Sequence, residues 1–264
     1  MTPDVTDLLA FAEELADAAD RLTMAHFGGP VAVVAKPDGS PVTEADRGVE
    51  AALRARIAAT YPDHAILGEE EGGALDPATP TWVLDPIDGT ANFLRGVPVF
   101  ATLIALVHDG RVLIGMASAP AMGERWDAAA GRGARRNGQP VGVSAVDALR
   151  DAHVLHGGLD WFRRSPALWN LLGRLADASW RTRGFGDFWM HLLVAGGMAD
   201  VALERDLKVW DVAALECIVT EAGGRLTAWD GGSALADATG AVLSTNGLLH
   251  PVVEDLLAVA TGSA

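Results

Sequence analysis

Apolar residues recur at helical spacing near the start of the chain. Leucine, phenylalanine and alanine side chains at positions 8, 11, 15, 19 and 22 predict an amphipathic helix over residues 7–27. A second helical pattern begins with the segment Val42-Thr43-Glu44-Ala45-Asp46 and runs through Ile57. Two apolar runs, 101–107 and 112–117, flank Asp109-Gly110 and predict a hairpin of two strands, and Asn137-Gly138 marks another such turn.

The second half alternates predicted strands and helices without a low-complexity linker. We expect strands at 152–156, 201–203, 225–228 and 241–244, and helices at 166–178, 187–198, 211–222 and from 248 onward. A composition shift at 142–149 suggests two halves, residues 1–142 and residues 143–264, that form one continuous unit. This order of elements predicts an α/β (α+β) fold with mixed sheets.

Composition and charge indicate the compartment of the protein and the classes of partner to expect. The 264 residues are half apolar, yet no run approaches the roughly 18 consecutive apolar residues of a membrane span. The first residues are acidic and lack the basic and apolar regions of a signal peptide. A single cysteine, Cys217, suits a reducing compartment, so we expect a cytoplasmic protein with no membrane partner. The formal net charge of −15 also argues against a nucleic-acid partner.

The segment Trp82-Val83-Leu84-Asp85-Pro86-Ile87-Asp88-Gly89-Thr90 places two carboxylates at the end of an apolar run. Pro86 has no N–H and restricts Asp85 to extended geometry, so the strand is expected to stop there. Gly89 permits a tight turn, and the two carboxylates then converge beyond the carboxyl end of the strand. Because they repel each other unless a proton or cation lies between them, they point to a divalent metal with the Thr90 hydroxyl beside it.

Three other acidic segments gain meaning beside this turn. Glu69 follows the short apolar run 65–67, Asp211 lies in the first turn of a predicted helix, and Asp46 precedes another helix. Each also has an ordinary explanation, because acidic runs are commonly solvated loops and aspartates commonly cap helices. Magnesium prefers oxygen ligands and often takes a substrate phosphate into its shell. The joint occurrence of all four segments favours a magnesium site that a phosphate completes.

In this order the four segments resemble the magnesium-dependent inositol monophosphatase superfamily. The matching motifs are Gly68-Glu69-Glu70, residues 85–93, Trp210-Asp211-Val212-Ala213-Ala214 and Glu221-Ala222-Gly223-Gly224, preceded by the segment from Lys36 to Asp46. The resemblance spans nearly the whole chain. It implies a layered αβαβα sandwich, a phosphoric monoester hydrolase acting on a small phosphate monoester, and commonly a homodimer. The N-terminal half would carry most metal ligands.

The resemblance also implies roles for individual residues. Glu69, Asp85, the carbonyl of Ile87, Asp88 and Asp211 match ligands for two or three Mg²⁺ ions. Asp85 bridges two ions, Glu69 and Ile87 complete one site, and Asp88 and Asp211 complete the other. Thr90 and Asp46 match the pair that polarises the attacking water, and with Glu69 they form the expected catalytic set. The N–H groups of Gly89 and Thr90 are expected to hold the phosphate, beside Asp88, if they open a helix.

Substrate choice depends on residues of the second half. Asp187 stands where inositol phosphatases usually have a small residue, and with Phe185 and Phe188 beside it resembles the bacterial histidinol-phosphate phosphatases of this superfamily. A carboxylate and an aromatic ring suit the ammonium and imidazole of histidinol phosphate, whereas inositol is neutral apart from its phosphate. Glu204 matches the family's substrate-contacting acid. Arg183 either contacts substrate or pairs with Asp187, for which a helix N-cap is the competing explanation.

The leading hypothesis is hydrolysis of L-histidinol phosphate to L-histidinol and phosphate, in histidine biosynthesis. The alternative is an inositol-1-phosphatase or broad sugar-phosphate phosphatase. A regulatory or RNA-associated binding protein is less favoured, because the acidic set is intact and the chain is strongly acidic. The seven histidines form no metal-spaced set and are expected to be mostly structural or exposed, while Cys217 is expected in the core.

Overall fold

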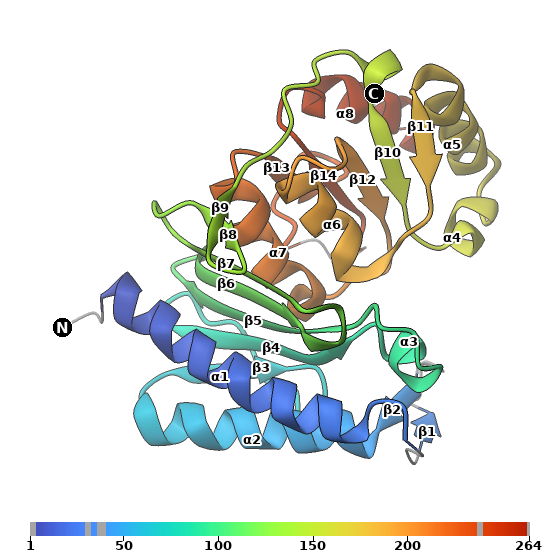
Figure 1. Cartoon of the computed structure of the whole chain (residues 1–264). Helices are drawn as coiled ribbons and strands as arrows, with labels where there is room; N and C mark the ends of the chain where they lie inside the picture. The colour runs from blue at the N-terminus through green and yellow to red at the C-terminus, as the bar shows by residue number, and fades with distance from the viewer. Residues whose placement is uncertain (1–3, 30–32, 36–40, 237–239, 263–264) are drawn as a thin grey trace.

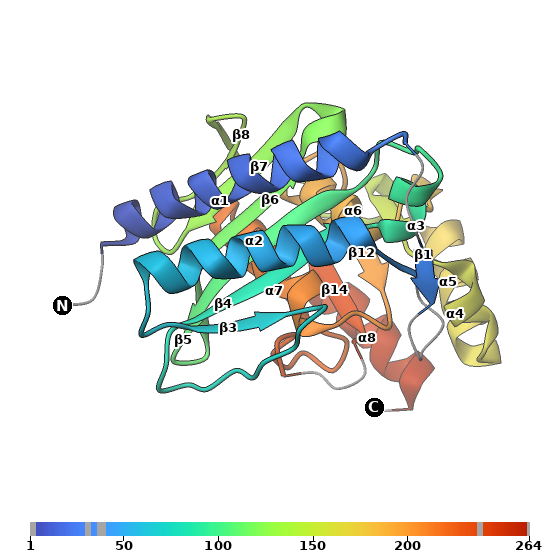
Figure 2. The ribbon, with the colours of Figure 1, turned by 90° about the horizontal axis from the view of Figure 1, so that it is seen from below.

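Helices and sheets alternate in five layers in the structure, a computed structural model that describes residues 4–29, 33–35, 41–236 and 240–262. Two long helices, α1 (Val5–His26) and α2 (Glu44–Thr60), cover one face of the larger sheet (Figure 1 and Figure 2). Helices α6 (Asp187–Ala195) and α7 (Val209–Glu221) lie between the two sheets. Helices α4 (Leu159–Arg163), α5 (Pro166–Ala178) and α8 (His250–Thr261) form the opposite outer layer. The expected αβαβα sandwich is therefore confirmed.

The larger sheet has seven strands in the order β3-β4-β5-β6-β7-β8-β9. They are β3 (Ala65–Gly68), β4 (Thr81–Asp88), β5 (Ala101–His108), β6 (Arg111–Ala119), β7 (Glu124–Ala129), β8 (Ala134–Arg136) and β9 (Gln139–Val141). Only β3 and β4 pair in parallel. Successive residues of β4 enter different cores, because Val83 packs toward α6 and α7 while Trp82 and Leu84 pack toward α1 and α2. Coverage on both faces explains the continuous apolar run.

The smaller sheet has five strands in the order β11-β10-β12-β14-β13. They are β10 (His153–His156), β11 (Arg181–Arg183), β12 (Val201–Glu204), β13 (Arg225–Ala228) and β14 (Val242–Thr245). The remaining elements are the pair β1 (Val33–Ala35) and β2 (Pro41–Thr43), the short helix α3 (Thr90–Leu94), and two 3₁₀ turns, η1 (Pro120–Met122) and η2 (Leu149–Asp151). Helix α7 contacts β4 to β7 of the larger sheet. The division at residue 142 stays a prediction.

The predicted helices and strands are present, with ends that differ by a few residues. The expectation that the strand stops at Asp85 is wrong, because β4 continues to Asp88. Its pairing with β5 is irregular between Asp85 and Asp88, where the Asp85 carboxylate accepts a hydrogen bond from the Ile87 N–H at 3.0 Å. Pro86 has no N–H to donate, and the N–H of Ile87 is satisfied by the Asp85 side chain. The strand therefore continues past Pro86 and Ile87 as a bulge.

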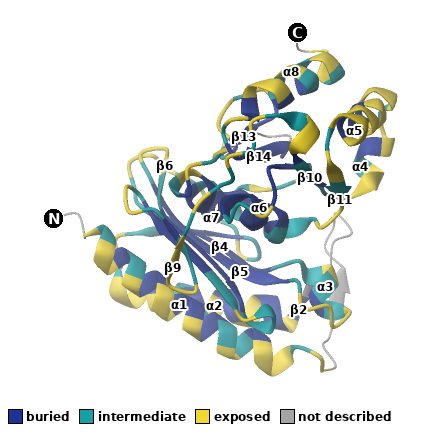
Figure 3. Ribbon diagram, turned by 45° about the horizontal axis from the view of Figure 1, so that its top comes forward, coloured by how far each residue is buried: buried dark blue, intermediate teal, exposed yellow. Residues whose placement is uncertain are grey.

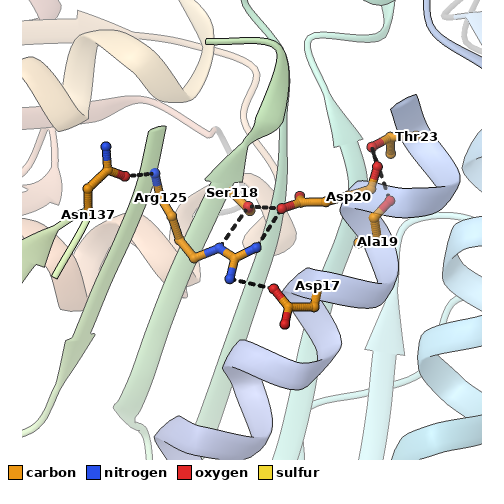
Figure 4. Close-up of polar contacts among 7 residues, drawn as sticks. All are labelled: Asp17, Ala19, Asp20, Thr23, Ser118, Arg125 and Asn137. Carbon is orange, nitrogen blue, oxygen red and sulfur yellow. Dashed lines mark hydrogen bonds and ion pairs between the residues drawn. The ribbon is translucent and has the colours of Figure 1, made fainter. Parts of the chain in front are cut away.

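Arg125 of β7 ties α1 to the larger sheet (Figure 4). Its guanidinium pairs with Asp17 at 2.7 Å and Asp20 at 2.5 Å, one helical turn apart on α1. Ser118 of β6 donates to Asp20 at 2.9 Å and accepts from Arg125 at 3.2 Å. These contacts fix α1 across the sheet and leave its outer face exposed (Figure 3).

Burial separates the inner layers from the outer ones. Figure 3 shows β4, β5 and α7 largely buried, while α1, α2, α5 and α8 expose their outward faces. Cys217 lies on α7 at 4% exposure, as expected for a core residue. Within the described residues, no helix has the length and apolar content needed to cross a bilayer.

Candidate active site

Three carboxylates from separate elements meet between the larger sheet and α7. Asp85 and Asp88 come from the last residues of β4, and Asp211 comes from the first turn of α7. One carboxylate oxygen from each lies within 4.8 Å of the others. Asp211 also accepts a hydrogen bond from the Lys208 N–H at 2.6 Å, so it caps α7 and joins the cluster at the same time. The two explanations for Asp211 are therefore compatible.

Burial and mutual repulsion make this cluster costly without a positive charge. Burial raises the pKa of Asp85 well above 3.8, and Glu69, Asp88 and Asp211 raise it further. The pKa of Asp88 is raised well above 3.8 by burial, Asp187 and Asp211, and burial raises that of Asp211 to about 7. With pKa values raised in this way, the metal-free cluster keeps a proton near neutral pH. A divalent cation would replace that proton, so the donor set fits a hard metal ion with oxygen ligands.

The stabilisation that Mg²⁺ confers on the fold should therefore grow as the pH rises from 3.8 to about 7. In this range the metal-free folded state holds protons on Asp85, Asp88 and Asp211 that the unfolded chain has released. Raising the pH removes them and lowers the free energy of unfolding of the metal-free protein. Thermal melts in EDTA and in saturating Mg²⁺, taken at several pH values, give the difference directly. Buried histidines titrate in both series and cancel, so a difference independent of pH contradicts the expectation.

Glu69 lies outside the group of three but close enough to raise the pKa values of Asp85, Asp88 and Asp211. Its turn is held by Glu50 of α2, a carboxylate with 0% exposure. Glu50 accepts hydrogen bonds from the N–H groups of Glu70 at 2.7 Å and Glu71 at 3.0 Å. A Cβ atom at Gly68 would lie 2.2 Å from the Glu50 carboxylate, so glycine is required there. Glu50 thus positions the turn that carries Glu69.

Replacing Glu50 with glutamine should weaken Mg²⁺ binding about tenfold, as is typical when a residue that orients a metal ligand is lost. Glu50 also pairs with Arg54 at 2.8 Å, so we expect the substitution to lower the free energy of unfolding by about 2 kcal/mol. Calorimetric titration and urea unfolding measure the two effects. Glu71→Gln is the matched control, because that side chain is 57% exposed and should change neither quantity appreciably. Unchanged Mg²⁺ affinity in Glu50→Gln would show that Glu69 does not depend on this support.

Asp46 and Thr90 lie beside the metal-binding candidates. The Thr90 hydroxyl is 2.9 Å from the Ile87 carbonyl and 3.5 Å from Oδ1 of Asp46. Asp46 is buried, and its Oδ2 accepts from the N–H and hydroxyl of Thr43 as part of a capping box at the start of α2. Burial raises the pKa of Asp46. Gly89 is left-handed at φ 80° and packs closely on the Val99 carbonyl, so α3 begins at Thr90 as expected.

Asp187 faces the same region from the start of α6. Its carboxylate accepts a hydrogen bond from the Asn92 amide at 3.0 Å, and the next N–H, of Phe188, donates to Asp88 at 2.7 Å. The N-cap of α6 is Gly186, so the N-cap explanation of Asp187 is wrong. The backbone of Asp187 has φ 51°, a conformation that aspartate tolerates better than most residues. Burial raises its pKa.

Glu204 ends β12 on the same side, at 8% exposure. Burial raises its pKa well above 4.5, and Asp187, Asp88 and Asp211 raise it further. Gly157 leaves space for it, because a Cβ atom there would lie 2.1 Å from the Glu204 carboxylate. Asp187 and Glu204 therefore extend the acidic cluster away from β4. Their negative charges suit a positively charged group of a substrate.

One neighbour of Asp187 lies differently from the expectation. Phe188 is in the core between α6 and the larger sheet at 1% exposure, so its ring does not flank the pocket. Phe185 is 39% exposed and packs on Trp189 at 5.0 Å. Arg183 is exposed and donates to the Thr182 carbonyl at 2.7 Å, while Asp187 bonds Asn92. Among the described residues Arg183 and Asp187 form no ion pair, and Lys36 lies outside the described residues.

Sequence reasoning missed Glu50 and Asn92 as parts of the site. Glu50 stands on the inward face of α2 with Asp46, Leu53 and Ile57, so a charge at an apolar helical position was the available signal. Asn92 follows the acidic turn closely and binds both the Val99 carbonyl, at 2.9 Å, and Asp187. No local pattern predicts a partner 95 residues away.

Comparisons with known proteins match nearly the whole chain. A model described as the inositol monophosphatase family matches residues 4–260. The chain is 45% identical over 253 residues to the histidinol-phosphatase of Mycobacterium tuberculosis, covering 94% of this chain and 96% of that protein. It is 41% identical over 258 residues to the histidinol-phosphatase of Streptomyces coelicolor, with the same coverage of 94% and 96%.

A solved structure shows the same fold. An IMPase of Thermotoga maritima is 30% identical and superposes with a TM-score of 0.87, covering 97% of this chain and 99% of that one. The likeness in fold therefore extends over nearly the whole chain. From its sequence match over residues 4–260 and its fold, the chain belongs to the inositol monophosphatase family.

Proposed function

We propose that the protein is a Mg²⁺-dependent phosphomonoesterase that hydrolyses L-histidinol phosphate to L-histidinol and phosphate. One observation carries the choice of substrate: Asp187 and Glu204 add two largely buried carboxylates beside the cluster of Asp85, Asp88 and Asp211. A neutral alcohol gives these additional carboxylates no counter-charge, whereas the ammonium of histidinol does. Two relatives at 45% and 41% identity are histidinol-phosphatases, which supports the same choice.

The proposed metal ligands are Glu69, Asp85, the Ile87 carbonyl, Asp88 and Asp211. Two or three Mg²⁺ ions would bind, with Asp85 shared between two of them. The close approach of Asp85, Asp88 and Asp211 supports this set, as does the position of Glu69 near enough to raise their pKa values. When bound, the ions neutralise phosphate oxygens and lower the pKa of the attacking water.

Thr90 and Asp46 are proposed to hold and deprotonate the attacking water. Oδ2 of Asp46 is occupied by Thr43, which leaves Oδ1 directed toward the Thr90 hydroxyl at 3.5 Å. A Thr90 proton turned from Ile87 toward Asp46 frees the lone pairs of Oγ1 to accept from water. The raised pKa of Asp46 makes it a better proton acceptor than an exposed aspartate. The N–H groups of Gly89 and Thr90, at the turn, are proposed to hold the phosphate.

The leaving alcohol is proposed to lie toward Asp187 and Glu204. The Asn92 amide fixes the Asp187 carboxylate, and the Phe188 N–H fixes Asp88, so the alcohol pocket and the phosphate site are connected through α3 and α6. Phe185, 39% exposed and two residues before Asp187, is the aromatic ring proposed for an imidazole. Arg183 is a proposed contact from the edge strand β11, where it is exposed.

Phosphate release tests the proposal. Histidinol phosphate, inositol-1-phosphate, fructose-1,6-bisphosphate and adenosine 3′,5′-bisphosphate are compared by kcat/KM in Mg²⁺ and in EDTA. We expect histidinol phosphate to be hydrolysed fastest and only with Mg²⁺. A preference for inositol-1-phosphate would favour the alternative function, an inositol-1-phosphatase or broad sugar-phosphate phosphatase. The likeness in fold to the Thermotoga maritima IMPase supports that alternative. No release from any of the four would remove the enzyme function.

A homodimer in the cytoplasm remains our expectation, and sedimentation in Mg²⁺ tests the dimer.

A further inference from the structure

A buried histidine faces Glu204 from the same helix that carries Asp187. His191 lies four residues after Asp187 on α6, so the two side chains project from neighbouring turns of one face. His191 is 1% exposed, and its Nε2 lies 3.8 Å from Oε2 of Glu204. Neither atom has a hydrogen-bond partner among the described residues. Two buried polar atoms that face each other without hydrogen-bond partners call for an explanation, and we expect a bound ligand to change their hydrogen bonding.

The other ring nitrogen of His191 is held by Ser244 of β14. Its Nδ1 lies 2.6 Å from the Ser244 hydroxyl, which is fully buried. Burial lowers the pKa of His191 to about 4, so the imidazole is neutral near pH 7 and carries one N–H. When the Ser244 hydroxyl donates to Nδ1, the proton of His191 lies on Nε2 and faces Glu204. Only this tautomer complements Glu204 in the ionised form that a bound cation favours, because the other tautomer places a lone pair against the carboxylate.

The charges around Glu204 explain why a neutral donor suits this position. Asp88, Asp187 and Asp211 all disfavour a further negative charge on Glu204. Among the described residues, no lysine or arginine forms an ion pair with Glu204, whose partner across 3.8 Å is His191. A lysine or arginine would cancel the carboxylate charge. A neutral N–H stabilises the ionised form and leaves its charge available to a cationic ligand.

We propose that His191 is a positioning residue for substrate specificity: its Nε2–H orients the Glu204 carboxylate toward the ammonium or imidazolium group of a cationic phosphate monoester. This inference rests on the proposed function, whose alcohol pocket it completes. Ser244 sets the tautomer of His191 and, being fully buried in the sheet, is not a nucleophile. The three side chains therefore link β14, which carries Ser244, through His191 of α6 to Glu204 at the end of β12.

Two amide substitutions separate the two ends of the imidazole. The amide of His191→Gln reaches the place of Nε2 and keeps a donor for Glu204, whereas that of His191→Asn reaches only the place of Nδ1 and keeps Ser244. We expect His191→Asn to raise KM for histidinol phosphate roughly tenfold, with kcat little changed, because the variant cannot form the hydrogen bond from Nε2–H to ionised Glu204 that we expect when the cation binds. His191→Gln should stay within about threefold of the unchanged protein. Neither substitution should alter KM for inositol-1-phosphate or another neutral alcohol phosphate.

Calorimetric binding of L-histidinol in Mg²⁺ and phosphate gives a second readout that needs no turnover. If His191→Asn does not fold, Ser244→Ala provides the same test, with an expected loss of about threefold in histidinol affinity. Equal KM values in the Asn and Gln variants, equal losses on cationic and neutral substrates, or unchanged histidinol binding in Ser244→Ala would overturn the role of His191. An unchanged protein that does not hydrolyse histidinol phosphate would instead overturn the proposed function.

Discussion

Replacing Asp85 with asparagine should abolish phosphate release and stabilise the metal-free protein. Asp85 is 1% exposed and lies with Asp88 and Asp211 in one group of carboxylates, where it is the proposed ligand shared between two ions. We expect kcat/KM to fall at least about a thousandfold, which corresponds to about 4 kcal/mol of transition-state stabilisation. Mg²⁺ affinity measured by calorimetry should fall with it.

The opposite effect on the metal-free fold follows from the same repulsion. Burial and three neighbouring carboxylates raise the pKa of Asp85, so the folded state holds a proton there at neutral pH or bears an unpaired buried charge. Asparagine removes that penalty and can still accept from the Ile87 N–H. The melting temperature in EDTA should therefore rise, while the increment from Mg²⁺ disappears.

A matched control removes one negative charge elsewhere on the larger sheet. Asp109 is exposed in the turn between β5 and β6 at φ 51°, a conformation that asparagine also tolerates. Asp109→Asn should leave phosphate release and the Mg²⁺ increment unchanged. If Asp85→Asn retained the full Mg²⁺ increment in melting temperature, Asp85 would not be a metal ligand in this chain.

The sequence predicted the elements of this site better than their ends. Periodicity and turn residues located the helices and strands, because each repeats a simple pattern over many residues. The sequence misplaces the end of β4, because a proline after an apolar run is typical of a strand terminus. A proline can also sit inside a bulge, where a side chain takes the hydrogen-bonding role of the missing ladder partner. This difference matters because the bulge lies between the two aspartates of the turn.

No local sequence pattern predicts the polar contacts between segments that lie far apart along the chain. Asn92 of α3 meets Asp187 of α6, and His191 of α6 meets Ser244 of β14. His191 has apolar neighbours on a mostly apolar helix, so its sequence environment is that of an ordinary core histidine. Its assignment depends on which buried atoms lack partners, and only the folded arrangement shows this.

Asp187 is expected to decide between a cationic and a neutral leaving alcohol. Its carboxylate is fixed by the Asn92 amide at 3.0 Å and lies where its charge raises the pKa values of both Asp88 and Glu204. Its bond to Asn92 and the adjacent bond from the Phe188 N–H to Asp88 support a position between the proposed phosphate site and the proposed alcohol pocket. Inositol phosphates have no positive group to pair with it, so its loss should affect the two substrate classes differently.

Asp187→Asn should lower kcat/KM for histidinol phosphate about a hundredfold, as expected for removing one partner of a largely buried charge pair. Activity on inositol-1-phosphate should change less than about threefold, because the amide keeps the size of the side chain and the tolerance of φ 51°. Asp187→Ala should show the same selectivity with an additional loss of stability, since alanine is strained at this φ. Paired kinetics on both substrates, with Mg²⁺ affinity measured separately, test this expectation. Equal losses in kcat/KM on the two substrates would mean that Asp187 supports the fold of the site and does not select the leaving alcohol.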